Sequence, residues 1–132
     1  MNTHQGFWQK DAFGQSVGIE MLETAPGYAK AQLTITAEHL NGLETVHGGV
    51  IFTLADCVFA AASNSHGVPA MAINVTISYV KAMREGTLIA EAQETSLNPK
   101  LGTYTVRVTN EHEELIALFQ GMVYRKTRSA SR

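Results

Sequence analysis

The chain has 132 residues, of which 45% are hydrophobic and 17% charged, with a formal net charge of −2. This length and composition suit one globular domain over residues 1–132, and they exclude a disordered or fibrous protein. The weakly acidic charge gives a nucleic-acid-binding function no support. Cys57 is the single cysteine, which excludes an intrachain disulfide and a cysteine-rich zinc site and indicates a reducing compartment, the cytoplasm.

The first predicted elements are a short helix or loop at 4–13 and a hairpin. Apolar runs on both sides of the turn signal Ala25-Pro26-Gly27 predict strands at 17–25 and 28–36. The N-terminus has neither the basic start nor the apolar run of a signal peptide, and no run of about 18 apolar residues could span a membrane. We therefore expect no contact with a membrane.

A long helix is predicted from residue 48 to about 65, because this stretch is longer than a typical strand and rich in alanine. On a helical wheel its polar residues share an arc of about 100° and nearly all other positions are apolar. These polar residues are Thr53, Asp56, Ser63 and Asn64. The helix should therefore be surrounded by other elements on most sides.

Four more strands are predicted after the helix, at 71–80, 87–96, 102–110 and 114–126. The order of strands and helix favours an α+β fold, in which a curved antiparallel sheet of about six strands wraps a long central helix. The last residues, about 127–132, are small, polar or basic, and we expect a flexible tail.

Asp56 is the only formally charged residue in the segment HGGVIFTLADCVFAAASNSHG, residues 47–67. A buried carboxylate without a cation is costly, and its pKa should rise. No lysine or arginine occurs between residues 45 and 80, so the local sequence offers Asp56 no partner. Either Asp56 lies on a wetted strip of the helix and pairs with a distant group, or it is a catalytic general base or nucleophile.

Gly48 lies where this helix starts, between His47 and Gly49. Free backbone N–H groups and the positive end of the helix dipole make a first turn a possible oxyanion site, although a plain loop-to-helix turn would have the same residues. Gly48 and Asp56 are eight residues apart, about 12 Å along one helix. If both are catalytic, they must therefore come from two copies of the chain.

Residues 47–67 resemble the signature of hotdog-fold acyl-CoA thioesterases of the phenylacetic-acid-degradation (PaaI-type) branch, and the resemblance extends over about residues 15–126. It implies a homodimer with a continuous sheet, often paired into a dimer of dimers, and two active sites at the dimer interface. It also implies that the N–H of Gly48 polarises the thioester carbonyl and that the partner's Asp56 is the base or nucleophile. Asn41 matches an asparagine that orients the thioester or the water, and His47 matches the histidine beside the oxyanion glycine.

Further candidates are weaker. Thr53 lines the pocket or is an ordinary surface or core threonine, and Asn74 stands near a strand position where some relatives carry a serine or aspartate that holds the water. Lys81, Arg84 and Lys100 are candidates to bind the phosphates of coenzyme A, and Gly102 could let the backbone approach the ligand closely. Each of the three cations taken singly is otherwise read as an ordinary solvated surface charge. The histidines have no ligand spacing, so we expect no metal and no cofactor besides the coenzyme A of the substrate.

The predicted function is hydrolysis of an aryl- or medium-chain acyl-CoA, such as phenylacetyl-CoA, to the acid and free coenzyme A. The main alternative is a hotdog module that binds or senses acyl-CoA without hydrolysing it. Asp56 together with His47 and Gly48 favours the enzyme. A hotdog dehydratase is a third option, but no residue pattern demands it.

Overall fold

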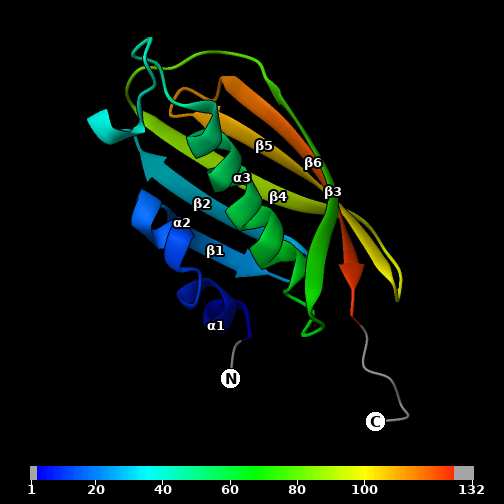
Figure 1. Cartoon of the computed structure of the whole chain (residues 1–132). Helices are drawn as coiled ribbons and strands as arrows, with labels where there is room; N and C mark the ends of the chain where they lie inside the picture. Colours follow the sequence, from blue (N-terminus) through cyan, green and yellow to red (C-terminus); the bar gives the residue numbers. More distant parts are fainter. Residues whose placement is uncertain (1–2, 127–132) are drawn as a thin grey trace.

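One long helix lies across a curved antiparallel sheet, and two short helices lie beside it at the N-terminal end of the chain (Figure 1). The computed structural model describes residues 3–126, so the tail predicted at 127–132 lies outside the described residues. In chain order the elements are α1 (Thr3–Gln9), α2 (Ala12–Val17), β1 (Glu20–Ala25), β2 (Tyr28–Thr34), the 3-10 helix η1 (Ala37–His39), α3 (Gly48–Ser63), β3 (Ala70–Tyr79), β4 (Thr87–Leu97), β5 (Leu101–Asn110) and β6 (Leu115–Arg125).

The six strands form one sheet in the order β1-β2-β4-β5-β6-β3, and all neighbours are antiparallel. β3 therefore crosses to the edge of the sheet farthest from β1, where β6 is its one partner among residues 3–126. The predicted α+β arrangement of one long helix and six strands is confirmed.

The helix α3 begins and ends at polar caps. His47 precedes the first turn, and its Nδ1 accepts a hydrogen bond from the N–H of Gly49 at 2.9 Å. At the other end Asn64 is the C-cap residue, and its side-chain amide donates to the carbonyl of Ala60 at 2.9 Å. The helix therefore ends two residues earlier than predicted, with Ser63 as its last residue.

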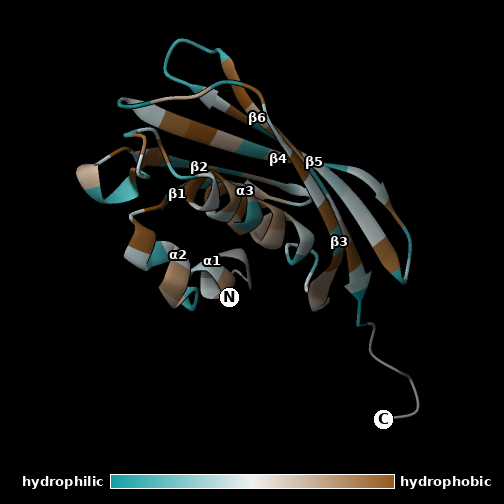
Figure 2. Ribbon diagram, turned by 45° about the horizontal axis from the view of Figure 1, so that its top comes forward, coloured by the Kyte–Doolittle hydropathy of each residue, from teal (hydrophilic) through white to brown (hydrophobic). Residues whose placement is uncertain are grey.

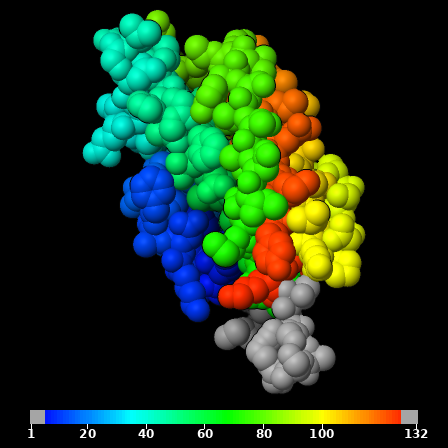
Figure 3. All heavy atoms as spheres, turned by 45° about the vertical axis from the view of Figure 1, so that its right-hand side comes forward, coloured from blue at the N-terminus to red at the C-terminus, as the bar shows by residue number. Residues whose placement is uncertain are grey.

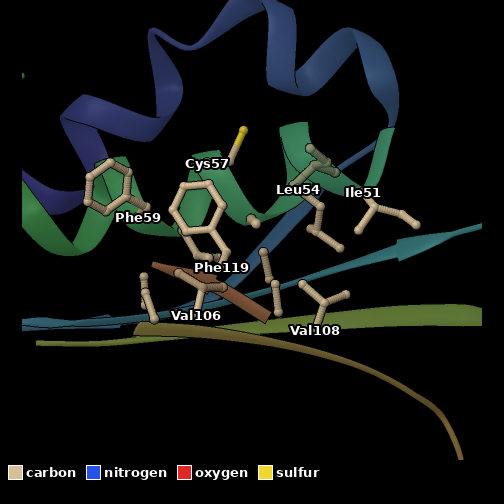
Figure 4. Packing of buried hydrophobic residues seen from close by; sticks show 14 of the residues in the cluster. Ile51, Leu54, Cys57, Phe59, Val106, Val108 and Phe119 are labelled. Atoms are coloured by element: carbon tan, nitrogen blue, oxygen red, sulfur yellow. The ribbon is translucent and has the colours of Figure 1, made fainter. Parts of the chain in front are cut away.

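Apolar side chains of α3 pack directly on the inner face of the sheet (Figure 4). The ring of Phe59 meets Tyr104 edge-on and lies 5.4 Å, centroid to centroid, from Phe119. Gly121 leaves room for Phe59, because a Cβ at residue 121 would lie 2.6 Å from that ring. Close packing of α3 on the sheet thus fixes the orientation of the whole helix.

The prediction for the N-terminal region was wrong in detail. The predicted first strand started too early, because residue 17 is the last residue of α2, a helix that Asp11 caps by accepting from the N–H of Gly14. Gly18, at a φ of 101°, adopts the left-handed conformation that ends α2, so β1 starts at Glu20. The expected single short helix or loop at 4–13 is instead α1 and the start of α2.

The predicted second strand also ended too late. β2 stops at Thr34, and the N–H of Ile35 binds the carbonyl of Gly86 in the loop before β4. The later strands match their predicted bounds to within one residue at each end.

Candidate active site

Gly48 is the first residue of α3, and its N–H has no acceptor among residues 3–126. An N–H at this position cannot bond within the helix, so it stays available to a ligand. It lies beside a cleft of about 290 Å³ whose lining residues are Val46, Gly48, Ile51, Tyr79, Val80, Lys81 and Ala82. The structure therefore offers a backbone donor at the start of the helix dipole, next to a space for a small group.

Tyr79 lies on Gly48 from the end of β3. Its hydroxyl donates to the carbonyl of Gly48 at 3.0 Å, and a Cβ at residue 48 would lie 3.2 Å from its ring. Sequence reasoning missed this residue, because periodicity places it on a strand without indicating which loop or helix end it meets.

His47 and Thr53 both bind the first turn of α3. His47 occupies the N–H of Gly49, as described above, and thereby leaves Gly48 as the free donor of the pair. The hydroxyl of Thr53 donates to the carbonyl of Gly49 at 2.7 Å, within the helix. Both residues hold the backbone around Gly48 in this chain.

Asp56 lies about two turns after Gly48 along α3. It is on the same side of the helix as Thr53, and its side chain is partly buried. Burial is the main cause that raises the pKa of its carboxyl, and the negative charge of Asp11 adds to the effect. Within the described part of the chain, its carboxylate forms no ion pair. Because α3 is one continuous helix, Asp56 and Gly48 are about 12 Å apart along its axis and cannot meet within one chain.

Asn41 organises its own loop. Its Oδ1 accepts hydrogen bonds from the N–H of Leu43, the N–H of Thr45 and the hydroxyl of Thr45, at 2.9, 3.1 and 3.2 Å. This loop leads directly into His47 and the start of α3. Within one chain, Asn41 therefore fixes the approach to the helix.

Asn74 lies on the outer face of the sheet, away from α3. It lines a hollow of about 410 Å³ together with Thr76, Thr103 and Gln120. The neighbouring side chain of Val75 instead faces the core. Within one chain the structure does not bring Asn74 to Gly48 or Asp56.

The predicted coenzyme A ligands fall into two groups. Lys81 borders the Gly48 cleft but also pairs with Glu114, and Arg84 is exposed in the loop that follows β3. Lys100 and Gly102 lie at the start of β5, which is level with the Met71 end of β3 across β6. The Tyr79 end of β3, where the Gly48 cleft lies, is eight residues or about 26 Å away along the strand.

The prediction for Gly102 needs correction. Gly102 is buried, and a Cβ there would meet Tyr104, Leu97 and Val123 at 3.1 to 3.3 Å. Glycine at this position serves the packing of β5 and offers no exposed backbone to a ligand.

Among residues 3–126, no three histidine, cysteine, aspartate or glutamate side chains are grouped so that they could hold a metal ion. The same residues contain no helix long and apolar enough to cross a membrane.

The family model of the thioesterase superfamily matches residues 43–117, more than half of the chain, including Gly48, Asp56 and Tyr79. The chain belongs to the thioesterase superfamily. The acyl-coenzyme A thioesterase PaaI of Escherichia coli strain K12 is 36% identical over 125 residues, which cover 94% of this chain and 89% of that protein. A protein of Archaeoglobus fulgidus is 47% identical over 119 residues, which cover 89% of this chain and 77% of that protein.

The fold of this thioesterase-superfamily chain matches that of a solved relative. The structure of the E. coli PaaI protein from the phenylacetic acid degradation operon aligns with a TM-score of 0.90 and 34% identity, covering 97% of this chain and 93% of that one. The resemblance to PaaI-type hotdog thioesterases, the hotdog fold and the prediction of a thioester hydrolase are thereby confirmed.

Proposed function

We propose that this protein hydrolyses an aryl- or medium-chain acyl-CoA, of the phenylacetyl-CoA kind, to the free acid and coenzyme A. Membership of the thioesterase superfamily and the likeness to E. coli PaaI support the thioester as substrate. A cytoplasmic homodimer, or a dimer of such dimers, is the proposed form. Coenzyme A enters as part of the substrate, and the proposed roles below require no metal or redox cofactor.

The proposed mechanism assigns the two halves of the reaction to two groups. The free N–H of Gly48 stabilises the oxyanion that develops on the thioester carbonyl, and the helix dipole adds to it. Asp56 removes a proton from the attacking water, or attacks the carbonyl itself. Its raised pKa makes it a stronger base than an exposed aspartate.

The other predicted residues support these two. His47 and Thr53 hold the first turn of α3. Asn41 orients the substrate or the water, and Asn74 is a candidate for holding the water. Lys81, Arg84 and Lys100 supply positive charge for the phosphates of coenzyme A.

The observation that carries the shared site is the separation of Gly48 and Asp56 along one rigid helix. One carbonyl carbon cannot lie within reach of both groups of the same chain. A second copy that brings its own α3 alongside, in the opposite direction, supplies Asp56 to the Gly48 of the first.

The edge strand β3 provides a surface for that second copy. In the part of the chain that the structure describes, β3 pairs on one side only, and Met71 and Ile73 are 69% and 57% exposed along it. Figure 3 shows β3 in green at the surface between α3 and β6, and Figure 2 shows hydrophobic segments along it. An apolar edge strand with free backbone groups invites pairing with another strand, and two copies of β3 would extend the sheet across the dimer.

A mixed dimer tests the shared site. Gly48→Pro removes the N–H donor and Asp56→Ala removes the carboxylate, so each homodimer should lose most of its activity. Loss of the donor alone should lower the rate about 10²- to 10³-fold. In the heterodimer, the intact Gly48 of one chain faces the intact Asp56 of the other, and one of the two symmetric sites is restored. Purified through two different tags, the heterodimer should recover up to about half of the wild-type rate per dimer.

An intrachain site predicts no recovery. A folded heterodimer as inactive as both parents would therefore exclude the shared site. Hydrolysis should be followed with a thiol reagent on phenylacetyl-, hydroxyphenylacetyl-, benzoyl- and straight-chain acyl-CoAs. A protein that binds these compounds without releasing coenzyme A would exclude the enzyme.

A further inference from the structure

The chain contains only two aspartates, Asp11 and Asp56, and the fold brings them into the same region of the molecule. They lie 45 positions apart in the sequence, on the N-terminal segment and on α3. The function proposed above uses Asp56 but gives Asp11 no role.

The carboxylate of Asp11 is held at both oxygens. Its Oδ1 accepts the N–H of Gly14 at 2.9 Å and caps α2. Its Oδ2 lies 3.5 Å from the Sγ of Cys57, which donates to it. Figure 4 shows the Cys57 sulfur pointing away from the sheet, toward the N-terminal helices. Asp11 is thus fixed against the residue that directly follows Asp56.

Gly14 allows this close approach. A Cβ at residue 14 would lie 2.8 Å from the Sγ of Cys57 and 3.0 Å from the ring of Trp8. Only a residue without a side chain fits there, so α2 packs tightly on α3 and carries its capping aspartate with it. The position of Asp11 is therefore set by packing as well as by hydrogen bonds.

Charged groups on the other elements near α3 are exposed or already bound to a partner. On the N-terminal segment Lys10 is exposed to solvent. On the sheet, Glu94 accepts from Tyr104 and binds His66, beyond the C-terminal end of α3. Of the titratable groups in the described chain, Asp11 is the one whose charge raises the pKa of Asp56, in addition to burial.

We propose that Asp11 is a positioning residue that the N-terminal helices hold against the turn of α3 that carries Asp56, where its negative charge assists proton uptake by the Asp56 carboxylate. The inference rests on the proposed function of Asp56. A general base works best when its own pKa approaches the working pH, and a fixed like charge favours proton uptake by its neighbour. The N-terminal helices would then contribute directly to the rate.

The small number of aspartates makes a direct test possible. Protein labelled with ¹³C at the aspartate side-chain carboxyl should give two carboxyl signals, and Asp11→Asn should leave the Asp56 signal alone. Asparagine keeps the size and still caps α2 through its single oxygen, while its amide N–H2 faces the Sγ of Cys57 in place of the second carboxylate oxygen, so the negative charge is removed with the packing kept. We expect the titration midpoint of the Asp56 signal to move to lower pH in this variant.

Two further variants complete the test. Asp11→Ser also retains a capping side chain and should give the same shift if Asp11→Asn folds poorly. Glu38→Gln removes one negative charge at an exposed residue and should leave the Asp56 midpoint unchanged. An Asp56 midpoint that stays in place in both Asp11 variants would overturn the proposal.

Activity gives an independent readout. In Asp11→Asn the acid limb of the kcat/KM profile should move to lower pH, and the plateau rate should fall about two- to fivefold because a weaker base transfers protons less efficiently. KM should stay unchanged. If instead Asp56→Asn hydrolyses acyl-CoA at the wild-type rate, the proposed role of Asp56 fails, while the carboxyl titration still decides whether the two aspartates are coupled.

Discussion

The hydroxyl of Tyr79 donates a hydrogen bond to the carbonyl oxygen of Gly48 at 3.0 Å, and so joins the end of the edge strand β3 to the first residue of α3. The ring of Tyr79 also covers Gly48 closely enough that a Cβ there would lie 3.2 Å from it. Gly48, whose N–H is the proposed oxyanion donor, is therefore held through its carbonyl by the end of a strand as well as by its place in the helix.

Tyr79→Phe should weaken that support without removing the ring. We expect a loss of about 0.5 to 1 kcal/mol in the free energy of unfolding, as for one hydrogen bond, and a severalfold lower kcat with an unchanged KM. Denaturant titration and steady-state kinetics measure the two effects. Tyr124→Phe, at a half-exposed residue on the outer face, is the matched control and should change neither quantity.

Gly48→Pro and Gly48→Ala separate the N–H donor from the space that glycine provides. Both substitutions add a Cβ that crowds Tyr79, but only proline removes the N–H. Proline suits the first position of a helix, and His47 already has the extended conformation, ψ 134°, that precedes a proline. We expect kcat to fall about 10² to 10³ further in the proline variant than in the alanine variant. Equal rates in two folded variants would exclude the donor role.

Asp56→Asn should stabilise the fold at neutral pH. Burial and the charge of Asp11 raise the pKa of Asp56 above its ordinary value of 3.8, so the folded chain holds this proton more tightly than the unfolded chain. The folded state consequently loses stability as the pH rises from that value through the raised one. Asparagine does not ionise, and its advantage in Tm at neutral pH should disappear below the ordinary pKa. An Asp56→Asn variant with a lower Tm than the wild type at neutral pH would contradict the expected stabilisation.

A single turnover in ¹⁸O-labelled water distinguishes the two roles open to Asp56. If Asp56 activates water, the label enters the product acid. If Asp56 attacks the thioester and the resulting anhydride is hydrolysed at the aspartyl carbonyl, the label enters the protein. We expect label in the product acid, and mass spectrometry of the peptide that contains Asp56 would reveal the other route.

Gly121→Ala should destabilise the chain through a steric clash. Its Cβ would lie 2.6 Å from the buried ring of Phe59, and overpacking a core typically costs about 1 to 3 kcal/mol. At Gly42 a Cβ would meet nothing within 4 Å, so Gly42→Ala is the control and should cost no stability. Thermal unfolding of both variants checks the difference.

Much of the fold could be read from the chain because its determinants are local. Apolar and β-branched runs between turn signals predicted the strands after α3 almost to the residue, and the length and alanine content of residues 48–65 predicted α3 itself. Ser63 shows the limit of such patterns, because it belongs to the polar arc and is nevertheless buried, with its hydroxyl bonded to the carbonyl of Ala60. A serine hydroxyl can donate its hydrogen bond to a carbonyl of its own helix and so be buried without another partner. A helical wheel does not show such backbone hydrogen bonds.

The sequence by itself determined that Gly48 and Asp56 lie on one helix and too far apart to act together, since helical rise depends on residue count alone. It could not place Tyr79 on Gly48 or Asp11 beside Asp56, nor show that Gly102 is buried. Those neighbours depend on the strand order, which carries β3 to the far edge of the sheet, and on the close packing of α2 against Cys57. Contacts between segments distant in sequence arise from the packing of whole elements, and no local pattern of residues specifies them.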